Sequence, residues 1–149
     1  MDFGRLKANI IFNGESVSIR YPKSPIRNHF RHADRLHGRK AFSAVYDAKA
    51  RKASGPLLVF TKANDAGRHR LGLSVSRRVG RAVVRSRVKR MVREAFRLHR
   101  HGWPGNYDLV VVVRPHEPMA LEDYVRHLTE AVAAGHRLWA RRATRKDEA

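Results

Sequence analysis

Residues 70–113 read RLGLSVSRRVGRAVVRSRVKRMVREAFRLHRHGWPGNYDLVVVV and contain the pattern of a strand, a helix and a second strand. Apolar and polar residues alternate in residues 70–76, which predicts a strand with one buried and one polar face. Residues 83–98 place apolar side chains every three or four positions, the period of an amphipathic helix. Residues 107–113 end in a run of valines, which is typical of a central strand covered on both faces. The order predicts a parallel pair of strands joined by a helical crossover.

Further elements are expected on both sides of this stretch. Residues 40–50 show one face of a short helix, and residues 57–60 form an apolar strand. Residues 119–142 predict a long helix with an acidic start and a basic end, an order that suits the helix dipole. The predicted order α-β-β-α-β-α is an α+β fold, in which helices pack on a small mixed sheet. We expect one domain over residues 29–142.

The two ends of the chain carry weaker patterns. Residues 1–28 have scattered charge and no sustained period, so we expect a flexible basic extension. An alternative is a marginal hairpin, with residues 10–12 and 17–19 joined around Asn13-Gly14. Residues 143–149 are expected to form a C-terminal tail.

The charge of the chain restricts its partners. Its 149 residues include 32 Lys and Arg against 13 Asp and Glu, a formal net charge of +19. Because 42% of the residues are hydrophobic, the chain can build a core, and the excess charge must lie on a folded surface. Such a surface favours a polyanion, either a nucleic acid or an anionic membrane, over an acidic protein.

Several classes of protein are excluded by residue content. The chain has no cysteine, which excludes disulfides, zinc knuckles and thiol nucleophiles. The longest apolar run, residues 109–113, is far shorter than the ~20 residues of a membrane span. No N-terminal segment resembles a secretory signal, so we expect a cytoplasmic protein without a membrane partner. Among polyanions this favours a nucleic acid.

The most distinctive feature is a series of cations on the predicted helix at residues 83–98 and just before it. Arg81, Arg85, Lys89, Arg93 and Arg97 recur at every fourth residue, so they should form one ridge. A solvated helix face is the alternative, but such faces mix both signs of charge, and here Glu94 is the only acid. Arginine forks match phosphate oxygens, so we expect this basic ridge to bind RNA. Its candidate residues are Arg77, Arg78, Arg81, Arg85, Ser86, Arg87, Lys89, Arg90, Arg93 and Arg97.

The sequence contains no recognisable hydrolytic centre. His116-Glu117-Pro118-Met119-Ala120 is not a zinc helix, because Ala120 stands where a second histidine is needed and Pro118 interrupts the helix. Acidic residues are sparse within the basic region, which argues against a two-metal carboxylate site. His99 and His101 flank Arg100, where a surface position or a phosphate contact is favoured over a metal. A structural RNA-binding protein of the ribosomal type and an independent nuclease remain alternatives from composition alone.

The motifs together resemble the protein subunit of bacterial ribonuclease P. The resemblance is carried by residues 70–80, by the basic block 82–97, by Arg35-Leu36 with Phe42 and Val45, and by residues 108–114. It covers residues 30–139. The family has Arg-Asn-Arg where this chain has Arg85-Ser86-Arg87, so the smaller hydroxyl of Ser86 replaces the family's amide.

The resemblance implies a ribonucleoprotein that removes the 5′ leader of precursor tRNA. In that family the RNA subunit performs the hydrolysis with Mg²⁺ that is held mainly by RNA, and the protein binds both this RNA and the leader. It implies no catalytic residue, no cofactor bound by the protein and no small-molecule substrate. It also implies a left-handed crossover between the parallel strands, against the usual right-handed hand.

The resemblance further implies a cleft for the leader between the first helix and the sheet. Phe42, Tyr46 and Phe60 match positions that line this cleft, where unpaired bases would stack on aromatic rings. The alternative is that these rings are ordinary core. The predicted polar face of residues 70–76 adds further cleft candidates, which are Arg70, Ser74 and Ser76. Trp103 and Trp139 are expected to serve packing.

Overall fold

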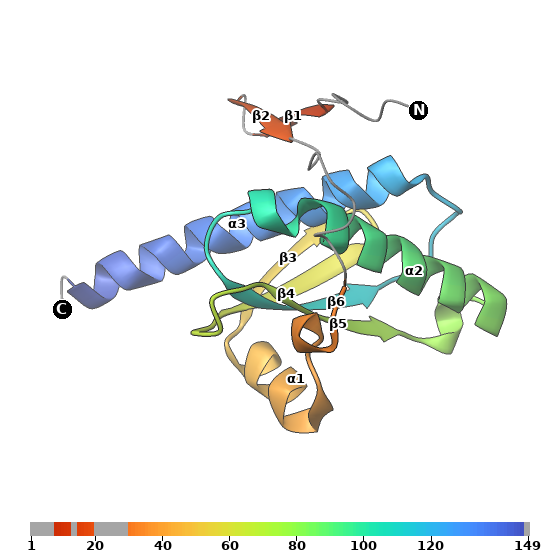
Figure 1. Ribbon diagram of the computed structural model, residues 1–149, viewed down its shortest axis with the longest axis horizontal. Helices are drawn as coiled ribbons and strands as arrows, with labels where there is room; N and C mark the ends of the chain where they lie inside the picture. Colours follow the sequence, from red (N-terminus) through yellow and green to blue (C-terminus); the bar gives the residue numbers. More distant parts are fainter. Residues whose placement is uncertain (1–7, 13–14, 20–29, 148–149) are drawn as a thin grey trace.

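A four-stranded mixed sheet forms the centre of the protein (Figure 1). The computed structural model describes residues 8–12, 15–19 and 30–147. The strand order is β3-β4-β6-β5, with antiparallel pairing except for the parallel pair β5–β6. The strands are Ala50–Ser54 (β3), Leu57–Ala63 (β4), Arg70–Val75 (β5) and Tyr107–Val113 (β6). The predicted α+β class and the parallel pair are therefore confirmed, while the hand of the crossover stays a prediction.

Helices cover both faces of this sheet. The helix α1 (Gly38–Asp47) packs on one face, against β4 and β6. The helices α2 (Ala82–His99) and α3 (Leu121–Asp147) lie side by side on the other face, as Figure 1 shows. Within that layer α2 lies over β5, whereas α3 lies over β3 and β4.

The central position of β6 in the sheet explains why residues 109–113 are all apolar. Leu109, Val111 and Val113 face the larger core beneath α2 and α3. Val110 and Val112 face the smaller core beneath α1. Because β6 is central and covered on both faces, the side chains of residues 109–113 are apolar on both faces of the strand.

The strand β3 was not expected from the sequence, and it is the main correction to the predicted order. The first helix ends at Asp47 instead of continuing to residue 50, and Lys49 then adopts a left-handed φ of 54°. Residues 50–54 pair with β4, and Gly55 and Pro56 connect the two strands as a hairpin. The core order is therefore α-β-β-β-α-β-α.

The two ends of the chain also differ from the preferred expectations. The helix α3 continues to Asp147, so most of the expected tail at residues 143–149 is helical where the structure describes it. Near the N-terminus, Ala8–Phe12 (β1) and Glu15–Ile19 (β2) pair as an antiparallel hairpin. This hairpin was the alternative to a flexible extension, and its expected turn, Asn13-Gly14, lies outside the described residues.

Candidate RNA interface

The basic ridge begins just before α2 and follows that helix. Arg77 and Arg78 lie exposed in a short 3-10 turn, η3 (Arg77–Val79). The helix α2 then turns its apolar stripe, which includes Val92 and Phe96, into the core. The opposite side of α2 is left to the cations, as its amphipathic pattern predicts.

The cations spaced by four residues do not form a straight exposed row. Four residues advance an α-helix by about 40° more than one full turn, so such a row winds around the helix. Arg81 is exposed, whereas Arg85, Lys89, Arg93 and Arg97 are half-buried. The outermost part of the ridge on α2 instead consists of Arg81, Ser86, Arg87 and Arg90.

The charge of the ridge is weakly balanced within the protein. Arg97 donates to Glu94 at 2.6 Å. Within the described residues, Arg81, Arg87 and Arg90 form no ion pair, and the buried Nε of Arg85 has no hydrogen-bond partner. Repulsion among these cations would be relieved by an external anion.

Arg35 extends the ridge from a different part of the chain. Burial and the positive charge of Arg35 lower the pKa of Arg93, so the two guanidinium groups act on each other electrostatically. The Arg35 guanidinium also lies over the ring of Phe30, 5.2 Å from its centroid. Arg35 was not expected in the ridge, because its neighbour Arg93 is distant in sequence.

The first turn of α2 also corrects a prediction. The apolar spacing of residues 83–98 predicts that Val84 is buried, yet it is 44% exposed, and Val83 beside it is 82% exposed. The apolar stripe becomes buried only from Val88 onward. Two exposed valines therefore lie among the ridge cations.

The face of the sheet beneath α1 carries the aromatic candidates. Phe42, Tyr46 and Phe60 are all half-buried, so each ring has one part in the small core and another part accessible. Tyr46 meets Phe60 edge to face, with ring centroids 4.8 Å apart. The ring of Phe42 lies directly on Gly72, where an added Cβ would be 2.6 Å from Phe42 Cζ. The structure therefore brings the three predicted rings together between α1 and the sheet.

The polar cleft candidates differ in their environment. Arg70 makes a bidentate contact with Asp108, through Nε at 2.6 Å and Nη2 at 2.7 Å. This hydrogen bond raises the pKa of Arg70, and Asp108 is held in turn by Asn64 at 2.8 Å. Ser74 is half-buried, and Ser76 is exposed beyond the end of β5. Arg70 is thus a fixed cation that is already paired.

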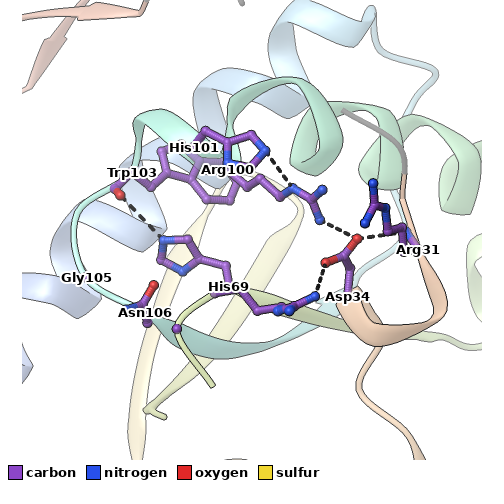
Figure 2. Close-up of a pocket in the computed structure, with 10 residues that line it drawn as sticks. Arg31, Asp34, His69, Arg100, His101, Trp103, Gly105 and Asn106 are labelled. Carbon is purple, nitrogen blue, oxygen red and sulfur yellow. Dashed lines mark hydrogen bonds and ion pairs between the residues drawn. The ribbon is translucent and has the colours of Figure 1, made fainter. Parts of the chain in front are cut away.

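A pocket of about 440 Å³ lies where β5 and β6 begin, beside the end of α2 (Figure 2). At its wall the buried Arg100 forms an ion pair with the buried Asp34 at 2.7 Å. Burial alone would raise the pKa of Asp34, but the hydrogen bonds of Arg100 and of the Arg31 backbone N–H lower it below its ordinary value. Asp34 belongs to the turn η2 (His32–Asp34), so this pair ties η2, and Arg35 after it, to the end of α2.

Two histidines near this pocket, His69 and His99, are buried, contrary to the expectation of a surface position for His99, whereas His101 is exposed as expected. His99 is 2% exposed, and its burial lowers its pKa to about 4. His69 accepts a hydrogen bond from the Tyr107 backbone N–H at 3.1 Å, and burial lowers its pKa as well. Trp103 is buried and donates to Thr129 at 3.2 Å, which confirms its packing role.

Comparisons with known proteins identify the family. The family profile described as Ribonuclease P matches residues 30–134 of this chain. The chain belongs to the ribonuclease P protein family. The "Ribonuclease P protein component" of Desulfovibrio desulfuricans is 43% identical over 98 residues, which are 64% of this chain and 75% of that protein. That of Exiguobacterium sibiricum is 40% identical over 94 residues, which are 60% of this chain and 81% of that protein.

Solved ribonuclease P proteins have the same fold. The protein from Staphylococcus aureus has 29% identity and a TM-score of 0.58, and the match covers 67% of this chain and 93% of that one. The protein from Thermotoga maritima has 28% identity and a TM-score of 0.58, and its match covers 63% and 90% of the two chains. As a ribonuclease P protein, the chain is a subunit of a ribonucleoprotein endonuclease.

The family match covers the central part of this ribonuclease P protein and leaves out its two ends. The basic ridge and the three aromatic rings Phe42, Tyr46 and Phe60 all lie within residues 30–134, whereas the last part of α3 lies beyond them. Among the described residues, no group of three His, Asp or Glu side chains is placed to hold a metal ion. In the same part of the chain, no helix is long and apolar enough to cross a membrane.

Proposed function

We propose that this chain binds the catalytic RNA of ribonuclease P through the basic ridge and assists Mg²⁺-dependent removal of the 5′ leader from precursor tRNA. The observation that carries the proposal is the surface of α2, where exposed Arg81, Arg87 and Arg90 form no ion pair within the described residues. Phosphate oxygens would supply the missing negative charge in a geometry that arginine recognises.

The second part of the proposal is that the unpaired leader lies between α1 and the sheet. The half-buried rings of Phe42, Tyr46 and Phe60 support this, since a base can stack only on a ring that is partly accessible. Ser74 and Ser76 would offer hydroxyl groups near the same face, and Arg70 would offer a fixed positive charge.

In this proposal the chemistry belongs to the RNA partner, and the protein changes the ionic conditions that this RNA needs. Arg and Lys side chains neutralise phosphates that would otherwise require additional cations. Mg²⁺ is then held mainly by RNA, and the protein reduces the concentration at which cleavage becomes efficient. We place this activity in the cytoplasm, where precursor tRNA is made in bacteria.

The test combines purified protein, a bacterial ribonuclease P RNA and precursor tRNA. We expect protein and RNA together to cleave at a Mg²⁺ concentration where RNA alone is slow, and we expect protein alone not to cleave. Robust metal-dependent cleavage by protein freed of RNA would overturn the proposal. RNA binding without any effect on cleavage would instead favour a structural RNA-binding protein.

A further inference from the structure

A second basic surface lies at the edge of the sheet opposite to β5. The strand β3 is an edge strand, and α3 packs over it and over β4. Between β3 and α3 is a hollow of about 200 Å³. Arg51 and Lys52 of β3 and Arg141 of α3 are among the residues that line it, and Lys52 lies on the face of β3 that α3 covers; these three residues define the β3–α3 groove.

The shape of this groove is fixed by close packing at its floor. An added Cβ on Gly135 would lie 2.9 Å from Thr61 Oγ1, so α3 approaches β4 more closely here than a larger residue would allow. The Trp139 indole N–H donates to the same Thr61 hydroxyl at 3.1 Å. Both contacts hold α3 against β4 at Thr61, which lines the groove.

The cations of the groove have no partner that explains them. Arg51, Lys52 and Arg141 are exposed, and none forms an ion pair within the described residues. Glu130, on the same helix, is engaged by the Ser54 hydroxyl at 2.8 Å.

The neighbouring Arg142, in contrast to Arg141, makes contacts that give it a structural role. Its guanidinium donates to the Ala48 carbonyl at 2.7 Å and lies 4.9 Å from the centroid of the Trp139 ring. Arg142 therefore ties α3 to the end of α1, whereas Arg141 beside it makes no such contact among the described residues.

Two general explanations could apply to these cations, one to those on the strand β3 and one to that on the helix α3. Charged residues on an edge strand prevent pairing with other chains, which would explain Arg51 and Lys52. Basic residues near the end of a helix offset its dipole, which would explain Arg141. Neither explanation requires cations from both elements to converge on one hollow.

We propose that the β3–α3 groove binds phosphates of a second segment of the partner RNA, separate from the segment bound by the basic ridge. The inference rests on the proposed function, which makes RNA the partner. The ridge lies over β5 and the groove lies at β3, so three interstrand spacings of about 4.8 Å separate the two edges of the sheet. Arg141 also lies beyond the family match at residues 30–134.

The first test compares variants that remove equal charge. The groove variant is Arg51→Gln with Lys52→Gln and Arg141→Gln. The matched control is Arg39→Gln with Lys40→Gln and Arg126→Gln, three exposed cations outside both surfaces. We expect the groove variant to lower affinity for ribonuclease P RNA about tenfold or more, and to reduce the magnitude of the log–log salt slope by about 2–3. The control should change both quantities much less.

The second test uses the absence of native cysteine, which gives each introduced thiol a unique label. Ala134→Cys places a tethered Fe–EDTA probe in the lining of the groove, and Ser86→Cys places one on the ridge. We expect hydroxyl radicals from the two sites to cleave different segments of the RNA. Equal affinity of the groove variant and its control, or no cleavage from Ala134→Cys, would overturn the inference. If removal of ridge cations also left RNA binding unchanged, the proposed function itself would fail.

Discussion

At the scale of single residues, the geometry of Tyr46 connects the proposed leader binding with packing. Its ring is half-buried and meets Phe60 edge to face at 4.8 Å. An accessible ring in this position can stack a base, while its inner edge still contributes to the small core. Substitution of Tyr46 therefore distinguishes base stacking from core packing, because the loss of each role has a different measurable effect.

We expect Tyr46→Ala to weaken binding of precursor tRNA to the ribonucleoprotein while mature tRNA is nearly unaffected. One stacked base contributes ~1–3 kcal/mol, so the loss should be about tenfold or greater. The measurement is the affinity of both tRNA forms, together with the melting temperature of the variant. Tyr46→Phe keeps the ring and serves as the control. Equal losses for both tRNA forms, or an unfolded variant, would assign the ring to the core alone.

The burial of His99 predicts how the stability of the protein changes at acidic pH. Its folded-state pKa of about 4 lies below the ordinary value of 6.5, because burial disfavours the charged imidazolium. The unfolded chain then binds more protons than the folded chain between these values, so stability falls as pH decreases through this window. We expect this one group to remove up to roughly 3 kcal/mol of stability between pH 6.5 and pH 4.

The measurement is urea unfolding at several pH values for the wild type and His99→Leu. The variant should lose less stability in the same window, although His69 keeps part of the dependence because burial lowers its pKa too. Parallel pH profiles of the two proteins would show that His99 does not titrate in this way.

At the scale of elements, α2 concentrates the cations that the proposed function needs. We expect Arg85→Ala with Arg87→Ala and Arg90→Ala to weaken binding to the partner RNA far more than the control variant at Arg39, Lys40 and Arg126. Each lost phosphate contact should also lower the magnitude of the log–log salt slope by about one. Affinities measured over a range of salt concentrations test both. An unchanged slope would make the ridge a solvated helix face.

The elements also show which parts of the fold sequence patterns could predict. The helix α2 and the strand β6 were predicted because each combines length with a strong apolar pattern. The strand β3 was not, since Ala-Arg-Lys-Ala-Ser has no apolar alternation and becomes a strand by pairing with β4. Its formation depends on tertiary context that local propensity does not contain.

The candidate site likewise has parts that the sequence could predict and parts that it could not. The ridge cations follow from their spacing within one helix, but their exposure required the position of α2 on the sheet. The pair Asp34–Arg100 could not be predicted, because it joins η2 to the end of α2 across a large separation in sequence. The groove at β3 could not be predicted because its strand was missed, although the expected helix at residues 119–142 already contained Arg141.

At the scale of the whole molecule, a net charge of +19 makes two properties respond to salt in opposite directions. Repulsion among like charges destabilises the compact state, and added salt screens it. The same salt competes with RNA binding, because each protein–phosphate contact releases counterions. The free protein should therefore become more stable in the conditions that dissociate it from its partner.

We expect the melting temperature of the free protein to rise by a few degrees when NaCl is raised from about 50 to about 500 mM. RNA affinity should fall by orders of magnitude over the same range. Differential scanning calorimetry and filter binding in identical buffers measure the two effects, and the ridge variant should show a smaller rise because it carries less repulsion. A melting temperature that fell with salt would mean that ion pairs such as Arg70–Asp108 and Arg100–Asp34 outweigh repulsion. The surface charge would then be balanced within the protein, and it would no longer require an RNA partner.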